Sequence, residues 1–430
     1  MKTYNPPPGW SEVPSRLPGI AIYAPPPQKD DVPDGPVSTK CKNCGSSMAF
    51  DPVRQVVACG ACGTEQEKVK AVGALAGAEG NEFTLEALRR GAKGWGVERK
   101  TLHCGQCGSD LVVEPGALAT SCPFCASNQV ELVAGDKDAV RPGYVLPFKL
   151  KSADLEKNVK GWLDKGWMHP GSLKQVARID KFVGVYLPYW IFDARTRASY
   201  ECEVGTDRQV TRRDSDGRTH TETVTDWEWK KGNIDRAWTG VKIPGTTKLS
   251  QVLLGRTHEK FDTGGCVPYD AGVLAGFQAQ SYDLALPEAW EKGRASIREL
   301  AKGACEQHAK GSRGDHVRNL TMNASMDDEV WRYVMMPVYV SAYKFDNRTW
   351  QVMVNGQTGE INGQKPVVWW RIYALIALML SPAVCSGVLG IPLTFFAVGV
   401  PLLVIALVLL VFAIVGSVYL WKSATAAEAA

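Results

Sequence analysis

Eight cysteines form four Cys-x-x-Cys pairs in the first third of the chain, and paired thiolates at this spacing are typical zinc ligands. Fourteen residues separate the first pair from the second, and fourteen again separate the third from the fourth. Two four-thiolate metal centres are therefore predicted. Their ligands are Cys41, Cys44, Cys59 and Cys62 in ribbon one, and Cys104, Cys107, Cys122 and Cys125 in ribbon two.

The two cysteine sets belong to an internal repeat with a period of 63 residues. Residues 41–46 match residues 104–109, and the two later pairs fall in register. A Cys-x-x-Cys turn presents two thiolates, and a short β-hairpin brings two such turns around one ion in a zinc ribbon. Glycine follows the second cysteine in three of the turns (Gly45, Gly63 and Gly108), where such turns often need a positive φ.

Four cysteines close the coordination shell and leave no position for water, so both sites are expected to be structural rather than catalytic. Two structural Zn²⁺ ions per chain are predicted. Iron in a rubredoxin-like site and a thioredoxin-like redox pair are competing interpretations, but the complete ligand set in both copies favours zinc. His103 precedes Cys104 and could replace a ligand, although beside four cysteines it is expected to be a neighbour.

Zinc ribbons often bind nucleic acid, and that function requires clustered positive charge. Ribbon one offers Lys40, Lys42 and Arg54, but residues 104–125 contain neither lysine nor arginine, and the whole chain has a net charge of only +4. The apolar side chains of ribbon two are expected to be exposed and to suit a protein contact; they are Leu111, Val112, Val113 and Phe124. The composition therefore favours protein partners over nucleic acid. It is also compatible with a homo-oligomer.

Sequence signatures of enzymes are absent from the chain: there is no GxxxxGK[ST] phosphate loop, GxGxxG, HExxH or GxSxG motif. The protein is therefore predicted not to be an enzyme, unless polar residues of 141–365 converge in one pocket. Trp227, Trp229 and Trp238 alternate along a polar segment and could form an aromatic contact surface. Packing in the core is the favoured interpretation of these three tryptophans.

The elements that position the cysteines belong to a multidomain chain. Residues 1–38 contain ten prolines and are predicted to be a disordered Pro-rich tail. The ribbons are expected to be β structures, ribbon one over 39–66 and ribbon two over 101–133. The linker of residues 67–100 should hold a short helix from Thr84 to Arg90.

Residues 141–365 are predicted to form an α+β domain, built as one unit or two. Strands are expected over 183–192 and 198–204, where apolar and alternating patterns occur. Ser152 should cap a helix that turns Leu155, Val159, Trp162 and Leu163 inward, and a second helix is expected over 288–310. Residues 214–217 read Asp-Ser-Asp-Gly, which predicts a hairpin turn.

Residues 367–421 are predicted to form a transmembrane helical hairpin. The first span, 367–389, has 23 residues and would reach about 34 Å as a helix, enough to cross a hydrocarbon core of ~30 Å. The second span covers 393–420. Aromatic residues at both outer ends and the flanking charges Lys365, Arg371 and Lys422 predict that both termini are cytoplasmic. Residues 422–430 are then a cytoplasmic tail of a multi-pass protein of the inner membrane.

The segments 145–149, 184–193 and 354–360, together with the ribbons, resemble bacterial proteins described as TFIIB-type zinc-ribbon-containing, which are often loosely labelled primosomal-helicase-like. The resemblance covers roughly residues 40–366. The chain departs from the pattern at Ala126, where ribbon two would usually have its final glycine. Membrane-tethered members are similar to anchors of SPFH/flotillin-type or phage-shock-protein-A-type membrane-stress systems, so the resemblance implies such protein partners.

The sequence as a whole predicts a membrane-anchored zinc-ribbon scaffold that recruits partner proteins to the cytoplasmic face of the membrane. A membrane-tethered regulator that binds nucleic acid is the alternative function.

Overall fold

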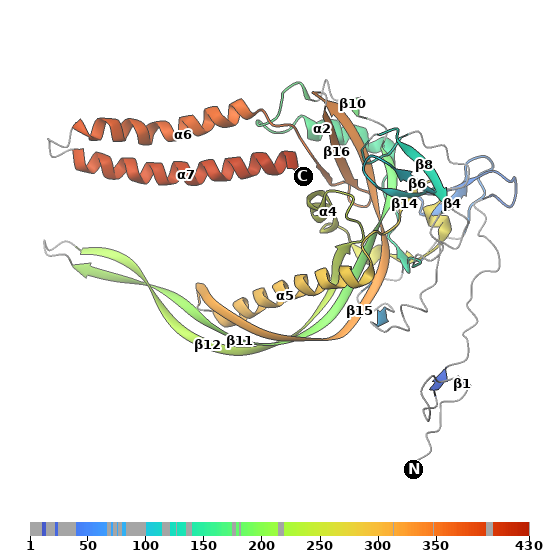
Figure 1. The fold of residues 1–430 in the computed structure, drawn as a ribbon, viewed down its shortest axis with the longest axis horizontal. Helices are drawn as coiled ribbons and strands as arrows, with labels where there is room; N and C mark the ends of the chain where they lie inside the picture. The colour runs from blue at the N-terminus through green and yellow to red at the C-terminus, as the bar shows by residue number, and fades with distance from the viewer. Residues whose placement is uncertain are drawn as a thin grey trace, which may run out of the picture.

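The structure is a computed structural model of the chain (Figure 1). It describes residues 11–13, 22–24, 40–66, 70–71, 75, 80–82, 100–113, 121–125, 127–134, 140–173, 178–179, 182–213, 219–312, 314–346, 348–392 and 399–429. The expected helix from Thr84 to Arg90, the turn of residues 214–217 and Ala126 lie outside these residues, as does most of the Pro-rich tail. Within that tail, β1 (Ser11–Val13) pairs with β2 (Ile22–Ala24).

One sheet of 13 strands forms the centre of the described molecule, so the soluble region is rich in β structure. Its main order is β13-β9-β15-β11-β14-β7-β6-β8, and β12, β16, β17, β5 and β10 join at the sides. The short strands are β5 (Asn81–Glu82), β6 (Lys100–Cys104), β7 (Asp110–Val113), β8 (Val130–Ala134), β9 (Tyr144–Val145), β10 (Arg178–Ile179), β13 (Val267–Pro268), β14 (Gln278–Gln280), β16 (Arg348–Asn355) and β17 (Ile361–Gly363). The long strands are β11 (Val183–Arg213), β12 (Thr219–Pro244) and β15 (His316–Phe345).

The two strands expected over 183–192 and 198–204 are parts of one strand, β11, which is 31 residues long. Residues 185–192 are buried, and from Ala194 to Val204 alternate side chains are buried. A register shift between Phe192 and Ala194 marks the change between the two patterns. Beyond it, β11 leaves the body and pairs with β12 and β15 as a three-stranded arm.

One helix covers the arm. Helix α5 (Leu286–Lys310) begins and ends close to the expected 288–310. Of the four apolar residues at helical spacing it buries Ile297, Ala301 and Ala304, whereas Leu300 is 46% exposed. The helix packs on the face of the arm that carries Ala198, Tyr200 and Cys202. Figure 1 shows α5 lying along the concave side of the three curved strands.

Short helices surround the body: η1 (Ser152–Asp154), α2 (Leu155–Leu163), α4 (Gln251–His258), η2 (Thr263–Gly265) and η3 (Ala271–Leu274). The expectation for Ser152 was wrong, because a 3₁₀ turn precedes α2 and Asp154 occupies the N-cap without a capping side chain. Helix α2 buries Leu155, Val159 and Leu163 as expected, whereas Trp162 is partly exposed.

Two apolar helices follow the body and lie against each other as a hairpin: α6 (Trp369–Gly390) and α7 (Gly399–Ala429). Both are long and apolar enough to cross a membrane. Helix α7 continues beyond Leu420, so described residues 422–429 extend it instead of forming a separate tail. Most of the hairpin surface is exposed; Phe412, for example, is 71% exposed.

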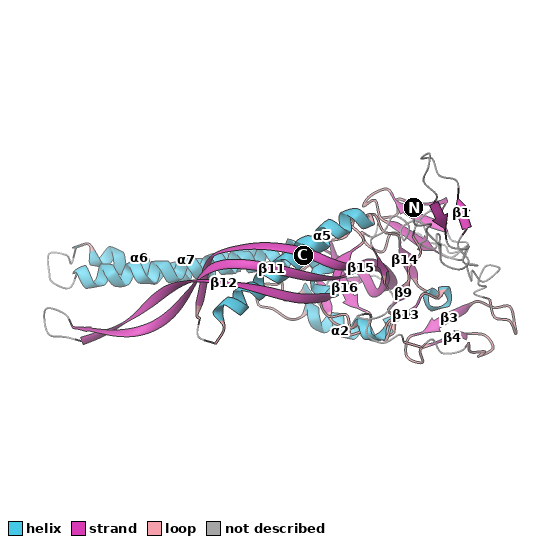
Figure 2. Cartoon of the chain, turned by 90° about the horizontal axis from the view of Figure 1, so that it is seen from below, coloured by secondary structure: helices cyan, strands magenta, loops and turns pink. Residues whose placement is uncertain are grey.

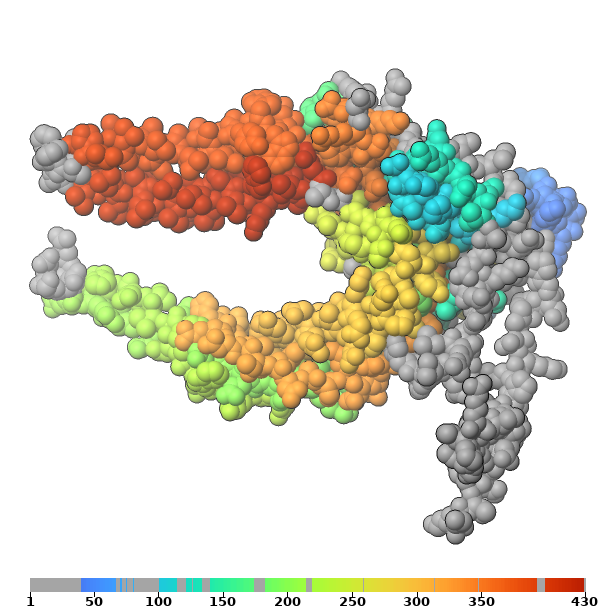
Figure 3. Space-filling view, viewed as in Figure 1, coloured from blue at the N-terminus to red at the C-terminus, as the bar shows by residue number. Residues whose placement is uncertain are grey.

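The arm and the helical hairpin extend from the body in the same direction (Figures 1 and 2). The space-filling view shows open space between them along their length (Figure 3). At its base the hairpin is fastened to the body, because Lys365 N–H donates to the carbonyl of Ala427 at 2.9 Å and Arg371 Nη1 donates to the carbonyl of Trp167 at 2.9 Å. The aromatic rings of Trp369, Tyr373 and Trp421 cluster there.

Candidate metal centres

Ribbon one brings its four predicted ligands together between β3 (Met48–Asp51) and β4 (Val56–Cys59), which form a two-stranded sheet. All four Sγ atoms lie within 4.8 Å of one another. Sγ of Cys41 is 3.6 Å from that of Cys62, and Sγ of Cys44 is 3.5 Å from that of Cys59. Cys41 and Cys59 are buried, whereas Cys44 and Cys62 lie at the surface.

Ribbon two repeats this geometry with its four predicted ligands, and their Sγ atoms again lie within 4.8 Å of one another. Sγ of Cys104 is 3.7 Å from that of Cys125, and Sγ of Cys107 is 3.7 Å from that of Cys122. A tetrahedral Zn–S distance of 2.3 Å places sulfur atoms about 3.8 Å apart. Both clusters therefore fit a metal ion bound by four thiolates, and zinc is the typical metal of such a donor set.

Backbone hydrogen bonds shape each turn so that the two thiols face the same point. In ribbon one, Gly45 N–H donates to the carbonyl of Cys41 at 2.8 Å, and in ribbon two Gly108 N–H donates to the carbonyl of Cys104 at 2.8 Å. The φ angles of Gly45, Gly63 and Gly108 are 71°, 75° and 68°. The predicted positive φ is confirmed at all three, and glycine is the residue that reaches it at least cost.

Two hydroxyl groups lie beside three of the ligands. Thr64 Oγ1 lies 3.0 Å from Sγ of Cys62, and Ser109 Oγ lies 3.2 Å from Sγ of Cys107 and 3.4 Å from Sγ of Cys122. Ser109 is fully buried, so water does not compete with the thiols for its hydroxyl group. A hydroxyl that donates to a thiolate stabilises the charged form, which is the form that binds metal.

The pKa values of the thiols reflect this surrounding. Hydrogen bonds with Cys122 and Ser109 together lower the pKa of Cys107 to about 4, against the effect of burial. The bond with Cys107 raises the pKa of Cys122, as does burial. In ribbon one, hydrogen bonds from Thr64 lower the pKa of Cys62 to about 6. Without metal, the thiols of each cluster therefore share protons, and a bound ion would displace the protons that remain.

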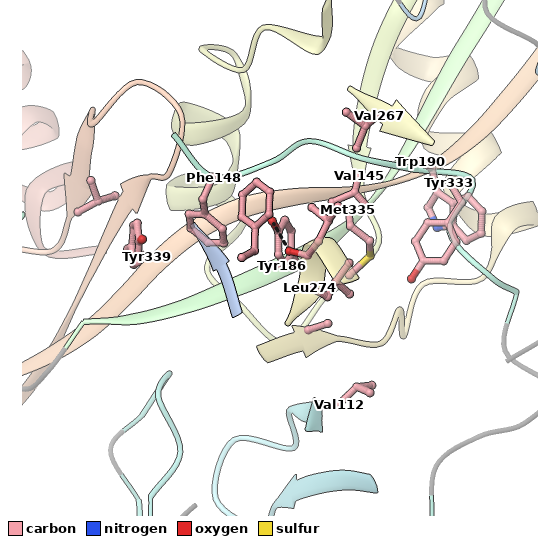
Figure 4. Close-up of a cluster of buried hydrophobic side chains, with 14 of the residues drawn as sticks. Val112, Val145, Phe148, Tyr186, Trp190, Val267, Leu274, Tyr333, Met335 and Tyr339 are labelled. Carbon is pink, nitrogen blue, oxygen red and sulfur yellow. Dashed lines mark hydrogen bonds between the residues drawn. The ribbon is translucent and has the colours of Figure 1, made fainter. Parts of the chain in front are cut away.

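The expectation that the apolar residues of ribbon two are exposed was wrong. Leu111, Val112, Val113 and Phe124 are 1–2% exposed. Strand β7 pairs with β14, with Val112 opposite Ala279 and Leu111 opposite Gln280, so ribbon two continues the central sheet. Val112 belongs to the main core cluster, which also contains Val145 and Phe148, and Figure 4 draws it below the other labelled side chains of this cluster. The protein contact expected of these residues is made within the chain itself.

Ribbon one also packs on the body. Phe50 N–H donates to the carbonyl of Ala275 at 3.1 Å, and Gln55 Nε2 donates to the carbonyl of Phe148 at 2.7 Å. An open cleft of about 680 Å³ remains between ribbon one and the body. Its charged side chains are already paired with each other, because Asp51 accepts from Arg54 at 3.2 Å and from Lys151 at 3.3 Å.

Charged and titratable neighbours of the ribbons are also engaged. His103 Nδ1 lies 2.7 Å from Asp110 Oδ1, so the ring is a neighbour of the cluster of ribbon two rather than a ligand, as predicted. Arg54 forms ion pairs with both Asp51 and Glu65. A guanidinium that two carboxylates neutralise offers little attraction to a phosphate.

The favoured core packing of the three tryptophans was wrong for two of them. Trp227 and Trp229 are 37% and 57% exposed on the arm, whereas Trp238 is partly buried against the main core cluster. Glu428, which lies in the predicted tail of residues 422–430, accepts from the N–H of Val367 at 3.0 Å and from Trp369 Nε1 at 3.3 Å. No local pattern in the sequence indicates these contacts of Glu428.

Comparison with known proteins finds a relative that aligns with most of the chain. Over 345 residues the chain is 24% identical to the uncharacterized protein YdjG of Bacillus subtilis (strain 168), an alignment that covers 79% of this chain and 92% of that protein. No protein-family model matches the chain, and no solved structure matches it. The chain is thus similar along most of its length to a protein that is itself uncharacterized.

Proposed function

We propose that the protein is a membrane-anchored scaffold, in which α6 and α7 cross the cytoplasmic membrane and the zinc-ribbon head recruits partner proteins on the cytoplasmic side. The observation that carries this proposal is the helical hairpin, whose apolar side chains are mostly exposed to solvent. Val388 and Val415, for example, are 63% and 64% exposed. Exposed apolar surface of this extent is costly in water and favourable in lipid.

The length and ends of the hairpin support a membrane-spanning arrangement. Helix α6 has 22 residues and α7 has 31, which correspond to about 33 and 46 Å. Tyr373, Tyr419 and Trp421 are exposed at the end of the hairpin nearest the body, where aromatic side chains would lie at the lipid headgroups. Arg371 and Lys422 lie at the same end, and the positive-inside rule then puts both termini in the cytoplasm.

The arm limits how the head can sit on the membrane. Its strands extend alongside the hairpin, and they carry exposed charges such as Arg208, Arg212 and Glu222. A charge in the hydrocarbon core costs about 2.5–3.5 kcal/mol even on the lower scales. The arm must therefore stay in water, so in a bilayer the hairpin meets the arm at a different angle from the one in this structure.

Zinc is the proposed metal of both ribbons, with a structural role. Each ribbon supplies four cysteines, and two in each cluster are buried, so the shell is closed and no position for a substrate remains. Bound zinc would cross-link the two Cys-x-x-Cys turns of each ribbon. The ribbons therefore build and stiffen the head.

The resemblance to TFIIB-type zinc-ribbon proteins suggests the class of partner, namely a membrane-stress protein of the SPFH/flotillin or phage-shock-protein-A type. The test compares the full chain with a chain that ends at residue 366, each used to co-purify bound proteins from cells. A recruited partner should bind both chains, and it should move from the membrane to the soluble fraction with the shorter one. A partner that stays on the membrane in both cases would contradict recruitment.

A further inference from the structure

Strand β12 presents a long free edge. Among the described residues it pairs with β11 alone, from Thr219 to Pro244, and its other edge has no strand beside it. Free edges of this length attract other strands unless they are interrupted. The opposite edge of the arm is interrupted, because β15 has positive φ angles at Asn319 and Asp328. Strand β12 itself pairs with β11 without a register shift from Thr219 to Trp238, so its free edge is regular over this length.

The outer part of the arm also lacks cover. Residues 207–213 and 219–223 form a two-stranded ribbon in which nearly every side chain is exposed on both faces. Helix α5 ends at Lys310, near Val204, and so it does not reach this ribbon. An isolated two-stranded ribbon is marginally stable in water. Another strand beside this part of the arm would therefore stabilise it.

We propose that this partner is a second copy of the chain, and that the two β12 strands pair antiparallel about a two-fold axis at Trp229. Such an isologous contact places residues at equal sequence distances from Trp229 opposite each other. Glu228 then faces Lys230 of the other copy, and Glu222 faces Arg236 of the other copy. Each of these pairs occurs twice, once on either side of the axis.

The apolar and aromatic side chains match in the same register. Val224 faces Ile234 of the other copy, Trp227 faces Lys231, and the two Trp229 side chains meet at the axis. Trp229 is 57% exposed in the single chain. Contact between the two Trp229 side chains at the axis would bury part of this apolar surface, which explains why such a large aromatic residue lies on the free strand β12. A shift of the axis by one residue, to Lys230, would instead place two lysines opposite each other.

Unmet charge supports this register. Among the described residues neither Glu228 nor Lys230 has an ion-pair partner, although most of the charges on the arm are paired within the chain. Arg195, for instance, binds Asp235 through two hydrogen bonds of 2.6 and 2.9 Å. The two charges beside Trp229 are therefore available to a second copy.

The position of α5 leaves room for this pairing. Its C-terminal end lies near the proposed axis. Gly314 N–H donates to the carbonyl of Lys310, a Cβ atom on Gly314 would meet Val204, and residues 203 and 229 are register partners. The two copies of α5 would therefore run away from the axis in opposite directions. The uncovered ribbon of one copy would then extend beside the helix-covered part of the other, which gives it the neighbour that it lacks. Because the arm and the hairpin extend in the same direction, this axis would point the two hairpins in opposite directions, and both reach one membrane only when each hairpin turns relative to its arm.

Cysteine cross-linking of the full chain in detergent tests the register. In a Cys385→Ser background, Trp229→Cys should form a cross-linked dimer with a short bismaleimide, because the two thiols meet at the axis. Thr221→Cys alone should not, since its two copies would lie about 50 Å apart. Mixing Thr221→Cys chains with Ala237→Cys chains should restore cross-linking. Equal cross-linking of all variants, or none with Trp229→Cys, would overturn the proposal.

A charge exchange provides a second test that does not depend on added thiols. Glu228→Lys or Lys230→Glu should each raise the dimer dissociation constant on the order of tenfold, because like charges would face each other twice. The double variant should recover the dimer, since the exchanged charges again match across the axis. Mass measurement in detergent reads the oligomer, and two zinc ions per chain would show that each variant is folded. A wild-type chain that stays monomeric would refute the dimer.

Discussion

At the scale of residues, the metal centres depend on side chains behind the ligands as well as on the ligands. The four sulfur atoms of each cluster come from turns that glycines and backbone hydrogen bonds hold in place. Ser109 is the hydroxyl that touches two ligands of ribbon two, at 3.2 and 3.4 Å. Its counterpart in the repeat is Ser46, which makes no side-chain hydrogen bond among the described residues.

Replacing Ser109 by alanine should therefore weaken zinc binding by ribbon two. Loss of a hydrogen bond to a metal ligand typically costs 10–100-fold in affinity, and we expect a decrease on this scale. Competition with a chelating dye would measure it as one of two zinc ions becoming easier to remove. Ser46→Ala is the matched control and should leave both ions as tightly bound as in the wild type. Equal effects of the two substitutions would contradict the role of Ser109.

A buried lysine at the base of the hairpin gives a pH prediction. Burial, and the nearby charge of Lys165, lower the pKa of Lys365 to about 8 from 10.5. The unfolded chain then binds more protons than the folded chain between these pH values, so this residue makes stability rise with pH from about 8 to 10.5. The free energy of unfolding in detergent should show this rise, and Lys365→Met should remove it. An unchanged pH profile in the variant would count against the assignment.

At the scale of elements, the fit of α5 on the arm is tight at one glycine and loose at another. A Cβ atom on Gly293 would lie 2.8 Å from Phe192 Cδ2, whereas one on Gly303 would meet nothing within 4 Å. Gly293→Ala should destabilise the protein by about 1–3 kcal/mol through overpacking. Gly303→Ala should stabilise it by up to about 1 kcal/mol through helix propensity. Thermal unfolding compares the two, and similar effects would contradict this packing of α5.

The sequence predicted elements that depend on neighbouring residues better than elements that depend on residues far away along the chain. The periodicity of α5 and the cysteine spacing are local patterns, and both predictions agree with the geometry. The burial of Val112 depends on pairing with Ala279, and the continuity of β11 depends on β15, more than 100 residues away. No window of sequence contains such pairings. Apolar side chains of ribbon two were therefore expected at the surface, although the sheet covers them.

At the scale of the whole molecule, the body carries two long projections, the helical hairpin and the arm, whose surfaces differ in polarity. The hairpin is apolar and suits lipid, whereas the arm is charged and suits water. Their similar direction means that a bilayer cannot surround the hairpin in this arrangement without also meeting the arm. A head that tilts at the membrane, or a hairpin that turns at residues 364–368, would resolve this conflict.

The central claim is that the hairpin holds a folded, two-zinc head at the membrane. Fractionation of cells that produce the full chain or residues 1–366, with zinc measured in the purified protein, tests it most directly. We expect the full chain to remain in the membrane fraction after a high-salt wash, and the shorter chain to be soluble with two zinc ions per chain. A shorter chain that still sediments with membranes, or a full chain that is soluble, would contradict the account.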